Sequence, residues 1–229
     1  MIINHKKKII FISVPKTAST SIMMFLDENS VHEKPEIYHQ TIKELLDSRV
    51  IDNILKYKII AVNRDPVARL ISVYADAIMD KNHITLGFIT KFKNFNEFCE
   101  SLHKDKQYLQ IRHLMPQQEF TKCDNSNNLN IKVYHYEKLL NLKIYLREKF
   151  PENQKEIGHY RETKTKRNPL VDIINTKSLI YIYKIYYEDY KKNPAYFISF
   201  IFYLLITIIS NSILFKFSAV RKTLKKFYV

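Results

Sequence analysis

Two short runs of apolar residues give the clearest structural pattern in this chain. Residues 9–14 read IIFISV, and residues 58–63 read KIIAVN. Strands that are covered on both faces are almost continuously apolar, whereas a half-exposed strand alternates. Residues 131–135 form a third candidate strand, and a short fourth strand is expected near residues 36–38. Because a turn and helical spacing follow each of the first two runs, we expect a parallel sheet with crossover helices.

Apolar residues at helical spacing fill much of the chain between these runs. Thr41 with Glu44 forms a capping-box pattern, and Asp65-Pro66 places a capping side chain before a proline at the first helical position. The predicted fold class is therefore α/β, a P-loop-like parallel sheet flanked by helices. The predicted helices cover about residues 20–28, 41–56, 66–81, 94–104, 137–149 and 170–192.

Residues 195–215 differ from the rest of the chain because they carry no charge. About 20 apolar residues are enough for a helix that crosses a bilayer, and a helix lying on an anionic membrane is an equal alternative. Basic residues on both sides leave the orientation open, and a buried or dimer-forming helix is the other interpretation. We therefore expect one globular domain over residues 1–192 and a C-terminal apolar helical appendage over residues 193–229.

The composition excludes several classes of protein. The chain has 229 residues, of which 46% are hydrophobic and 26% charged, as is typical of a globular protein. Its two glycines are too few for a dinucleotide-binding or Walker-type loop, each of which needs glycines close together. Cys99 and Cys123 form no CxxC pair, which argues against a zinc ribbon or a disulfide scaffold and favours a reducing compartment.

Charge and the N-terminal segment add two further expectations. The chain carries 37 Lys+Arg against 23 Asp+Glu, and the formal net charge of +14 predicts an anionic partner. The apolar run at residues 9–14 is too short for a secretory signal, and Pro15-Lys16 ends it. We therefore expect a cytoplasmic protein that is associated with a membrane through residues 195–215.

A first candidate site is the sequence PKTASTS at residues 15–21, between the first strand and the first helix. Backbone N–H groups and the positive end of the helix dipole meet there, which favours binding of an anion. Lys16 adds a mobile positive charge, and Ala18 leaves room for the ligand. The alternative, an ordinary capped helix start, needs one hydroxyl and no lysine. The hydroxyl donors of the segment are Thr17, Ser19, Thr20 and Ser21.

A second candidate site follows the second long strand, at Arg64. This position opens toward the crevice in which α/β sheets bind ligands, and a guanidinium group fits a phosphate with two hydrogen bonds. Ser72 follows about two helical turns later, on a face that can meet the same anion. The alternative for Arg64 is a pair with a carboxylate that holds the loop together.

Together these two segments resemble the PAPS-dependent sulfotransferases of the carbohydrate (family 2) branch, where PAPS is 3′-phosphoadenosine 5′-phosphosulfate. Members of that family usually carry PKTAGTS in the first loop and R-x₇-S in the second. Residues 113–120 (H-x-x-P-Q-x-x-F), 136–139 (Y-E-x-L) and 183–190 (ending in D-Y) are similar to three further family segments, in the same order. The resemblance extends from about residue 9 to residue 190.

The resemblance implies roles for individual residues. Lys16 would be the catalytic cation that stabilises charge on the departing phosphate oxygen, and the family reaction needs no metal. At Ser19 the family usually has glycine, and a serine there would need a backbone conformation that glycine tolerates better. The implied 5′-phosphosulfate site comprises Pro15, Lys16, Thr17, Ala18, Ser19, Thr20 and Ser21, and the implied 3′-phosphate site comprises Arg64 and Ser72.

The reaction also needs a base for the acceptor hydroxyl, and His39 is the first candidate. It precedes the Thr41 cap at the edge of the sheet, and histidine exchanges protons near neutral pH. His113 and Glu119 are the reserve candidates for the base. His113 and Gln117 are also candidate contacts to the acceptor. A surface histidine in a loop is the plain alternative for His39.

These observations predict a sulfotransferase that moves a sulfuryl group from PAPS to a hydroxyl of a carbohydrate or glycolipid. The predicted partners are that acceptor and an anionic membrane surface, with no nucleic acid. One alternative is a relative of the P-loop nucleotide kinases, although neither their GxxxxGK[ST] loop nor a magnesium-binding carboxylate after a strand is present. Another is a basic protein that binds a membrane surface without catalysis.

Overall fold

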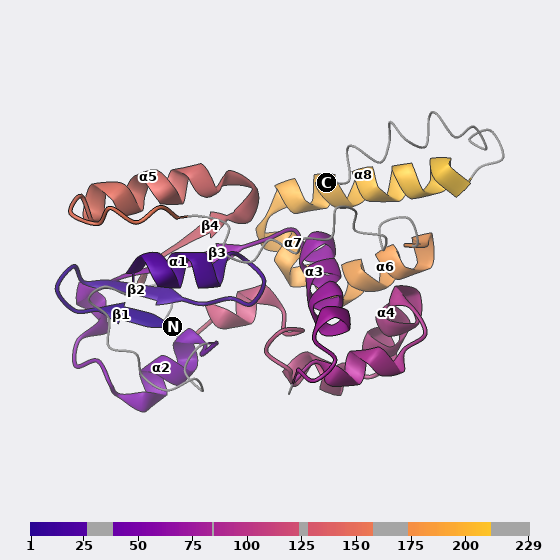
Figure 1. The fold of residues 1–229 in the computed structure, drawn as a ribbon, viewed down its shortest axis with the longest axis horizontal. Helices are drawn as coiled ribbons and strands as arrows, with labels where there is room; N and C mark the ends of the chain where they lie inside the picture. Colours follow the sequence, from indigo (N-terminus) through magenta and orange to yellow (C-terminus); the bar gives the residue numbers. More distant parts are fainter. Residues whose placement is uncertain (27–38, 84, 124–127, 158–173, 212–229) are drawn as a thin grey trace. The chain divides into compact units, whose positions relative to one another are not determined.

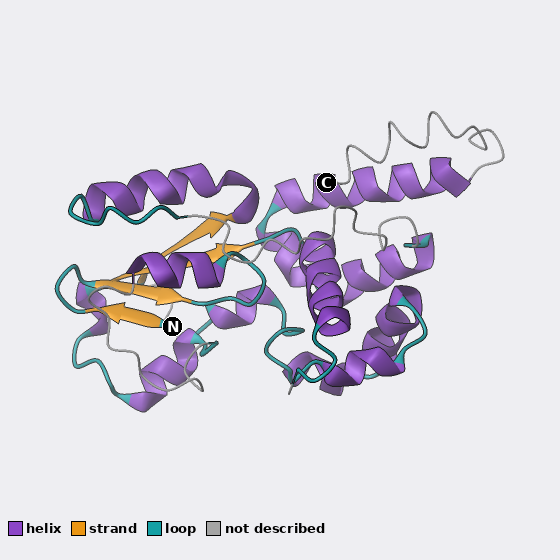
Figure 2. Ribbon diagram, viewed as in Figure 1, coloured by secondary structure: helices purple, strands orange, loops and turns teal. Residues whose placement is uncertain are grey.

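The computed structural model describes residues 1–26, 39–83, 85–123, 128–157 and 174–211. The chain forms two compact units, and each has its own hydrophobic core. Unit 1 contains residues 1–64 and 115–162, and unit 2 contains residues 65–114 and 163–229. Figure 2 shows that the strands lie in unit 1, whereas the described part of unit 2 is built from helices and loops.

Unit 1 contains a four-stranded sheet in the order β1 (Ile2–Asn4), β2 (Ile9–Ile12), β3 (Lys58–Asn63) and β4 (Asn130–His135). The β2–β3 and β3–β4 pairs are parallel, which confirms the α/β prediction and its three main strands. β1 pairs antiparallel with β2 and was not expected from the sequence. The strand predicted near residues 36–38 lies outside the described residues.

The hairpin between β1 and β2 depends on two local features. The side-chain Oδ1 of Asn4 accepts a hydrogen bond from the backbone N–H of Lys7 at 2.8 Å. Lys8 then adopts a left-handed backbone with φ 54°, which reverses the chain before β2. β1 has only three residues, which are too few for an alternation of apolar and polar side chains to be recognised in the sequence.

Helices cover both faces of this sheet (Figure 1). α1 (Ser19–Leu26) and α5 (Leu139–Lys149) pack on one face, where Ile22 and Leu142 meet Phe11 and Ile60. On the other face α2 (Ile42–Ser48) and the 3₁₀ helix η6 (Gln117–Phe120) contact a second core that includes Ile10, Ile12 and Ile59. Because both faces are covered, every residue of β2 is buried, which explains its continuous apolar sequence.

α2 begins where the capping box predicts, but it is much shorter than the expected helix over residues 41–56. The Thr41 side chain accepts from the backbone N–H of Glu44, and the Glu44 carboxylate accepts from the backbone N–H of Thr41 at 2.8 Å. The helix ends at Arg49, which is left-handed with φ 51°. A separate 3₁₀ helix, η3 (Ile54–Lys56), precedes β3.

Unit 2 packs its helices around a core that includes Val67, Phe98, Leu114 and Ile182. The helix predicted over residues 170–192 begins outside the described residues, and from residue 174 onward it is replaced by two helices. They are separated at Tyr186, whose hydroxyl donates to the carbonyl oxygen of Leu114 at 2.8 Å. The elements of unit 2 are α3 (Pro66–Met79), η4 (Gly87–Lys91), α4 (Phe95–Lys104), η5 (Lys106–Gln110), α6 (Thr176–Ile185), α7 (Tyr187–Lys192) and α8 (Pro194–Asn211). In unit 1 the short η8 (Tyr136–Lys138) leads into α5.

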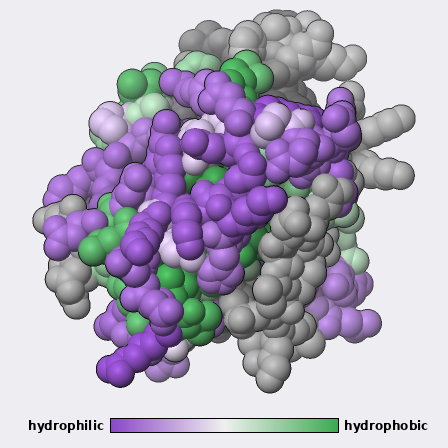
Figure 3. Space-filling model, turned by 90° about the vertical axis from the view of Figure 1, so that its left-hand side faces the viewer, coloured by the Kyte–Doolittle hydropathy of each residue, from purple (hydrophilic) through white to green (hydrophobic). Residues whose placement is uncertain are grey.

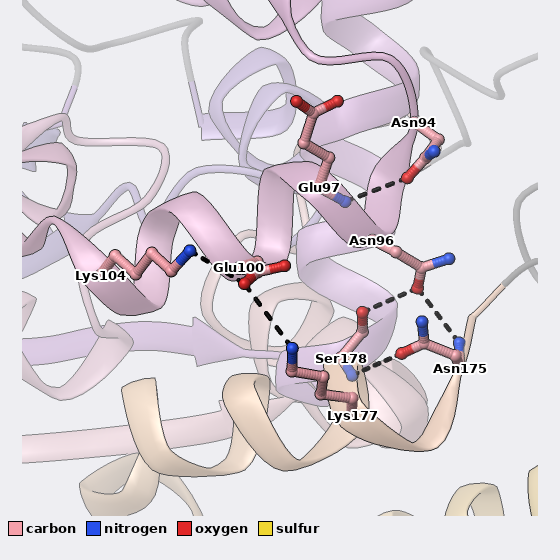
Figure 4. Close-up of polar contacts among 8 residues, drawn as sticks. All are labelled: Asn94, Asn96, Glu97, Glu100, Lys104, Asn175, Lys177 and Ser178. Carbon is pink, nitrogen blue, oxygen red and sulfur yellow. Dashed lines mark hydrogen bonds and ion pairs between the residues drawn. The ribbon is translucent and has the colours of Figure 1, made fainter.

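Polar contacts join α4 to the start of α6 (Figure 4). The Oδ1 atom of Asn96 accepts from the Ser178 hydroxyl at 2.7 Å and from the backbone N–H of Asn175 at 3.1 Å. Glu100, one turn along α4, pairs with Lys104 at 2.9 Å and with Lys177 at 3.6 Å. Residues far apart in the sequence thus fix the register of two neighbouring helices.

α8 contributes to the core of unit 2, so the predicted separate appendage is not confirmed. Tyr196 and Phe200 are 3% and 5% exposed and belong to the same cluster as residues of α6 and α7. Along the described part of the chain, no helix is both long enough and apolar enough to span a bilayer. This finding contradicts the predicted localisation, a cytoplasmic protein held at a membrane through residues 195–215. Part of that uncharged stretch is apolar because it packs inside unit 2.

The face of the molecule displayed in Figure 3 is mainly hydrophilic, with hydrophobic side chains in smaller patches between polar ones. This pattern agrees with a chain in which 26% of the residues are charged. Charged side chains of folded proteins stay at the surface unless they are paired, because removing them from water is costly.

Candidate functional site

The loop that follows β2 has an unusual backbone. Lys16 and Ala18 both adopt the left-handed conformation, with φ 65° and φ 63°, whereas Thr17 between them does not. For residues with a side chain this conformation costs roughly 1–2 kcal/mol each. Alternation of this kind turns successive backbone N–H groups toward one side and forms an anion-binding concavity. The expectation of strain at Ser19 is wrong, because Ser19 begins α1 and does not have a positive φ.

The hydroxyl groups of this loop fall into two groups. Thr17 is fully buried, and its hydroxyl donates to the carbonyl oxygen of Val14 at 2.9 Å, so it closes the turn. Ser19, Thr20 and Ser21 form the first turn of α1, ahead of the hydrogen bond from Ile22 N–H to the Ala18 carbonyl at 3.1 Å. The first turn of a helix points backbone N–H groups away from the helix body, and this arrangement suits an incoming anion.

Arg64 follows β3 and lies beside this loop within unit 1. Its NH1 atom donates to the carbonyl oxygen of Lys16 at 3.3 Å. Its guanidinium carbon lies 4.3 Å from the centre of the Tyr136 ring, which is a cation–π contact. The carboxyl ends of β2, β3 and β4 therefore contribute Lys16, Arg64 and Tyr136 to one place. That edge is where open α/β sheets bind ligands.

Gln117 holds the backbone of Arg64 with both ends of its side-chain amide. The Arg64 N–H donates to Oε1 at 2.8 Å, and Nε2 donates to the Arg64 carbonyl oxygen at 2.7 Å. The Gln117 side chain is completely buried. The sequence predicted Gln117 as a contact to the acceptor, which stays a prediction, and it gave no indication of the contact with Arg64. The Tyr136 contact was also missed, although the Y-E-x-L segment had marked its position.

His39 lies at the same edge of the sheet, beside the end of β2. Its Nδ1 atom is 2.7 Å from the carbonyl oxygen of Ser13 and 3.3 Å from the Ser13 hydroxyl. A carbonyl oxygen only accepts hydrogen bonds, so Nδ1 carries the proton in the neutral ring and Nε2 is its proton acceptor. A histidine oriented in this way is ready to act as a base. Its catalytic role stays a prediction.

Two further polar groups lie at the carboxyl ends of β3 and β4. The Oδ1 atom of Asn63 is buried and has no hydrogen-bond partner among the described residues. Asn63 is opposite His135 in the register of β3 and β4. Burial lowers the pKa of His135 below its ordinary value. The nearby Glu137 carboxylate acts against this shift, and Lys138 adds a smaller effect in the same direction as burial. An acceptor such as Asn63 Oδ1 suits a hydrogen-bond donor on a ligand.

Of the remaining predicted site residues, Ser72 and His113 belong to unit 2 and Glu119 belongs to unit 1. Ser72 is half-buried on α3. The carbonyl oxygen of His113 accepts from NH2 of the buried Arg69 at 3.1 Å, and its ring lies 5.4 Å from the ring of His83. Glu119, a reserve candidate for the base, forms an ion pair in which its Oε1 atom lies 3.9 Å from Nζ of Lys122. The roles of Ser72, His113 and Glu119 stay predictions.

The comparison with protein families decides the identity of the chain. A family model described as the sulfotransferase family matches residues 1–192, which is most of the sequence. The chain belongs to the sulfotransferase family. It is therefore a transferase of sulfuryl groups. No curated protein and no solved structure matches this sulfotransferase.

Several features of unit 1 fit an anionic ligand of this sulfotransferase. The left-handed loop, the first turn of α1 and the Arg64 guanidinium all present donors, and donors are what phosphate and sulfate groups need. Among the described residues, no group of three His, Cys, Asp or Glu side chains is arranged to hold a metal ion.

Proposed function

We propose that this sulfotransferase transfers the sulfuryl group of PAPS to a hydroxyl of a carbohydrate or glycolipid. The observation that carries the proposal is the contact between Arg64 and the Lys16 carbonyl, because it brings the two predicted phosphate-binding segments together in unit 1. The family match supports sulfuryl transfer in general. The resemblance to the carbohydrate branch supports PAPS as the donor and a glycan hydroxyl as the acceptor.

In the proposed donor site, the loop over residues 15–21 binds the 5′-phosphosulfate. Support comes from the left-handed backbone at Lys16 and Ala18 and from the N–H groups at the start of α1. Arg64 binds the 3′-phosphate, and Ser72 is assigned to the same phosphate by the resemblance alone. The Tyr136 ring supports Arg64, since a cation–π contact on its guanidinium helps to hold that group in place.

The proposed reaction is a direct transfer in which positioning matters more than covalent catalysis. The acceptor oxygen forms a bond to sulfur while the bond from sulfur to the 5′-phosphate oxygen breaks. The electron pair of that bond stays on the phosphate, and Lys16 stabilises the charge that develops there. The Nε2 atom of His39 takes the proton of the acceptor hydroxyl. The products are a sulfate ester and adenosine 3′,5′-bisphosphate (PAP).

Calorimetry with PAP and with AMP tests the donor site, because the two ligands differ in the 3′-phosphate. We expect the wild-type protein to bind PAP at least tenfold more tightly than AMP. Arg64→Ala should weaken PAP by about tenfold or more, since one charged hydrogen-bonded contact contributes roughly 1.5–3 kcal/mol, and it should change AMP much less.

The matched control for this experiment is Arg147→Ala. Arg147 is an exposed residue of α5 whose guanidinium carbon lies 5.6 Å from the centre of the Phe25 ring and whose NH1 donates to the Asn153 carbonyl oxygen at 2.7 Å. This variant should leave the ratio of PAP to AMP affinity unchanged. Equal losses of PAP and AMP affinity in Arg64→Ala would contradict the assignment of Arg64 to the 3′-phosphate. Absence of PAP binding to the wild-type protein would contradict the proposed donor.

A further inference from the structure

The end of β3 is held in an unusual way. The last pair between β2 and β3 is Ile12 with Ala61, and the last pair between β3 and β4 is Asn63 with His135. Arg64 lies beyond both, so no neighbouring strand pairs with its backbone there. The Gln117 side chain supplies this missing pairing with hydrogen bonds of 2.8 Å and 2.7 Å to the N–H and C=O of Arg64.

This contact fixes the orientation of the Arg64 backbone. The backbone N–H of Arg64 can only donate and its C=O can only accept, so the Gln117 amide has one possible orientation. Two hydrogen bonds to one residue constrain its peptide planes as a strand neighbour does. Because the Gln117 side chain is completely buried, shortening it takes away the partners that the fold provides for the Arg64 N–H and C=O groups.

The position of the backbone determines what the Arg64 guanidinium contacts. With the Arg64 backbone held in place, the guanidinium carbon lies 4.3 Å from the centre of the Tyr136 ring, and NH1 donates to the Lys16 carbonyl oxygen at 3.3 Å. Lys16 is one of the two left-handed residues of the predicted 5′ loop. An arginine that is already held loses less conformational freedom when it binds an anion, and such preorganisation improves affinity.

We infer that Gln117 is the positioning residue of the anion site and that it acts through Arg64, with Tyr136 as the second support. Gln117 holds the Arg64 peptide, and Arg64 in turn ties the end of β3 to the loop over residues 15–18. The identity of the anion in this inference rests on the proposed function. The role of Gln117 as a support for Arg64 differs from the contact to the acceptor that the sequence predicted.

The first test needs no ligand and uses amide hydrogen exchange of the full chain. Gln117→Leu removes both hydrogen bonds and puts an apolar side chain of similar size in place of the amide. We expect the Arg64 amide and the amides of residues 16–18 to exchange at least tenfold faster than in the wild-type protein. The amides of residues 59–62, inside β3, serve as the internal control and should keep their protection. Unchanged exchange at Arg64 and at residues 16–18 would overturn the inference.

The second test measures PAP and AMP binding in the absence of any acceptor, so a contact between Gln117 and the acceptor cannot affect the result. Gln117→Leu should reduce PAP affinity about tenfold, which corresponds to ~1.4 kcal/mol, and AMP affinity much less. Tyr136→Leu should act in the same direction, whereas Tyr136→Phe keeps the ring and should bind PAP as the wild-type protein does. A ratio of PAP to AMP affinity that is unchanged in Gln117→Leu would overturn the inference.

Gln117→Glu separates positioning from a loss of folding. A protonated carboxyl group has one donor and one acceptor and restores both contacts, whereas an ionised carboxylate only accepts. Burial beside the Arg64 carbonyl raises the pKa of such a carboxyl group. The deficit in PAP affinity relative to the wild-type protein should therefore shrink from pH 8 to pH 5.5, while the deficit of Gln117→Leu stays constant. Equal pH profiles for the two variants would contradict the proposed role of these two hydrogen bonds in anion binding.

The two tests also separate this inference from the proposed function. If the wild-type protein binds neither PAP nor AMP, the proposed donor is wrong, and the exchange experiment alone decides the role of Gln117. If the wild-type protein binds PAP and Gln117→Leu changes neither exchange nor affinity, the donor stands and the role of Gln117 is wrong.

Discussion

At the scale of single residues, the side chains of Thr17 and Arg64 hold the loop after β2 in a conformation that differs from an ordinary helix start. Lys16 and Ala18 hold left-handed conformations that usually favour glycine, although the chain has only two glycines and neither lies here. Thr17 closes the turn through Val14, and Arg64 contacts the Lys16 carbonyl. These contacts offset the strain of the backbone and keep its N–H groups in place.

Lys16→Ala tests the role of this residue in sulfuryl transfer. Alanine keeps a Cβ atom, so the variant removes the ammonium group without easing the left-handed backbone. Turnover should fall well over tenfold, because a cation at the departing oxygen contributes mainly to the transition state, while PAP binding survives in part. The measurement is the steady-state rate with PAPS, compared with PAP affinity from calorimetry.

The control for Lys16→Ala is Lys43→Ala, which removes an exposed lysine from α2. It lowers the net charge by the same amount and should leave turnover unchanged. If both variants lost turnover equally, a general effect of charge would explain the result. Turnover in Lys16→Ala equal to that of the wild-type protein would remove Lys16 from the mechanism.

The sequence located most of the candidate residues but not their contacts. It identified Lys16, His39 and Arg64 because their residue types and positions after strands suit anion binding and proton transfer. It gave no indication that His39 bonds to Ser13 or that Gln117 bonds to Arg64, and these pairs are separated by 26 and 53 residues. Local patterns carry no information about which distant residue completes a hydrogen bond.

At the scale of elements, Asn96 links two helices of unit 2 through one oxygen atom. Its Oδ1 accepts from Ser178 and from the backbone of Asn175, the residue that caps α6. The contact therefore ties the start of α6 to α4 (Figure 4). The sequence predicted a helix over residues 94–104 but could not predict which helix packs beside it.

Asn96→Ala should lower the free energy of unfolding by about 1–3 kcal/mol, because it removes the acceptor of two hydrogen bonds. Urea denaturation monitored by circular dichroism measures the change. Asn96→Asp keeps an oxygen acceptor at the same position and should retain most of the stability. A loss in Asn96→Asp as large as in Asn96→Ala would show that the acceptor oxygen is not what stabilises this contact.

Differences between predicted and observed elements have local physical causes. The helix expected over residues 41–56 stops at Ser48 because Arg49 is left-handed, and helical spacing alone does not reveal that reversal. The helix expected over residues 170–192 is interrupted at Tyr186, which bonds to the Leu114 carbonyl. In both places tertiary contacts or a turn outweigh a weak helical preference.

At the scale of the whole molecule, each unit contains one of the two cysteines. Cys99 is fully buried in the core of unit 2, and Cys123 is half-buried in unit 1. Burial raises the pKa of the Cys99 thiol far above its ordinary value. Because the thiolate is the reactive form, the native fold protects Cys99 from alkylation.

Treatment of the native protein with iodoacetamide should therefore modify Cys123 first, and Cys99 only as unit 2 unfolds. Peptide mass spectrometry over a time course measures both rates. In 6 M guanidinium chloride the two cysteines should react at similar rates, which controls for differences in local sequence. Equal rates in the native protein would contradict the buried position of Cys99.

The sequence by itself determined the parallel strands, the loop after β2, Arg64 after β3 and membership of the sulfotransferase family. Each of these follows from residues that are close together in the chain, whose spacing directly expresses local structure. The tertiary structure alone decided that Gln117 holds Arg64, that the Tyr136 ring contacts the Arg64 guanidinium, and that α8 packs into unit 2. These contacts join residues far apart in the sequence, and only the folded backbone brings their side chains within bonding distance.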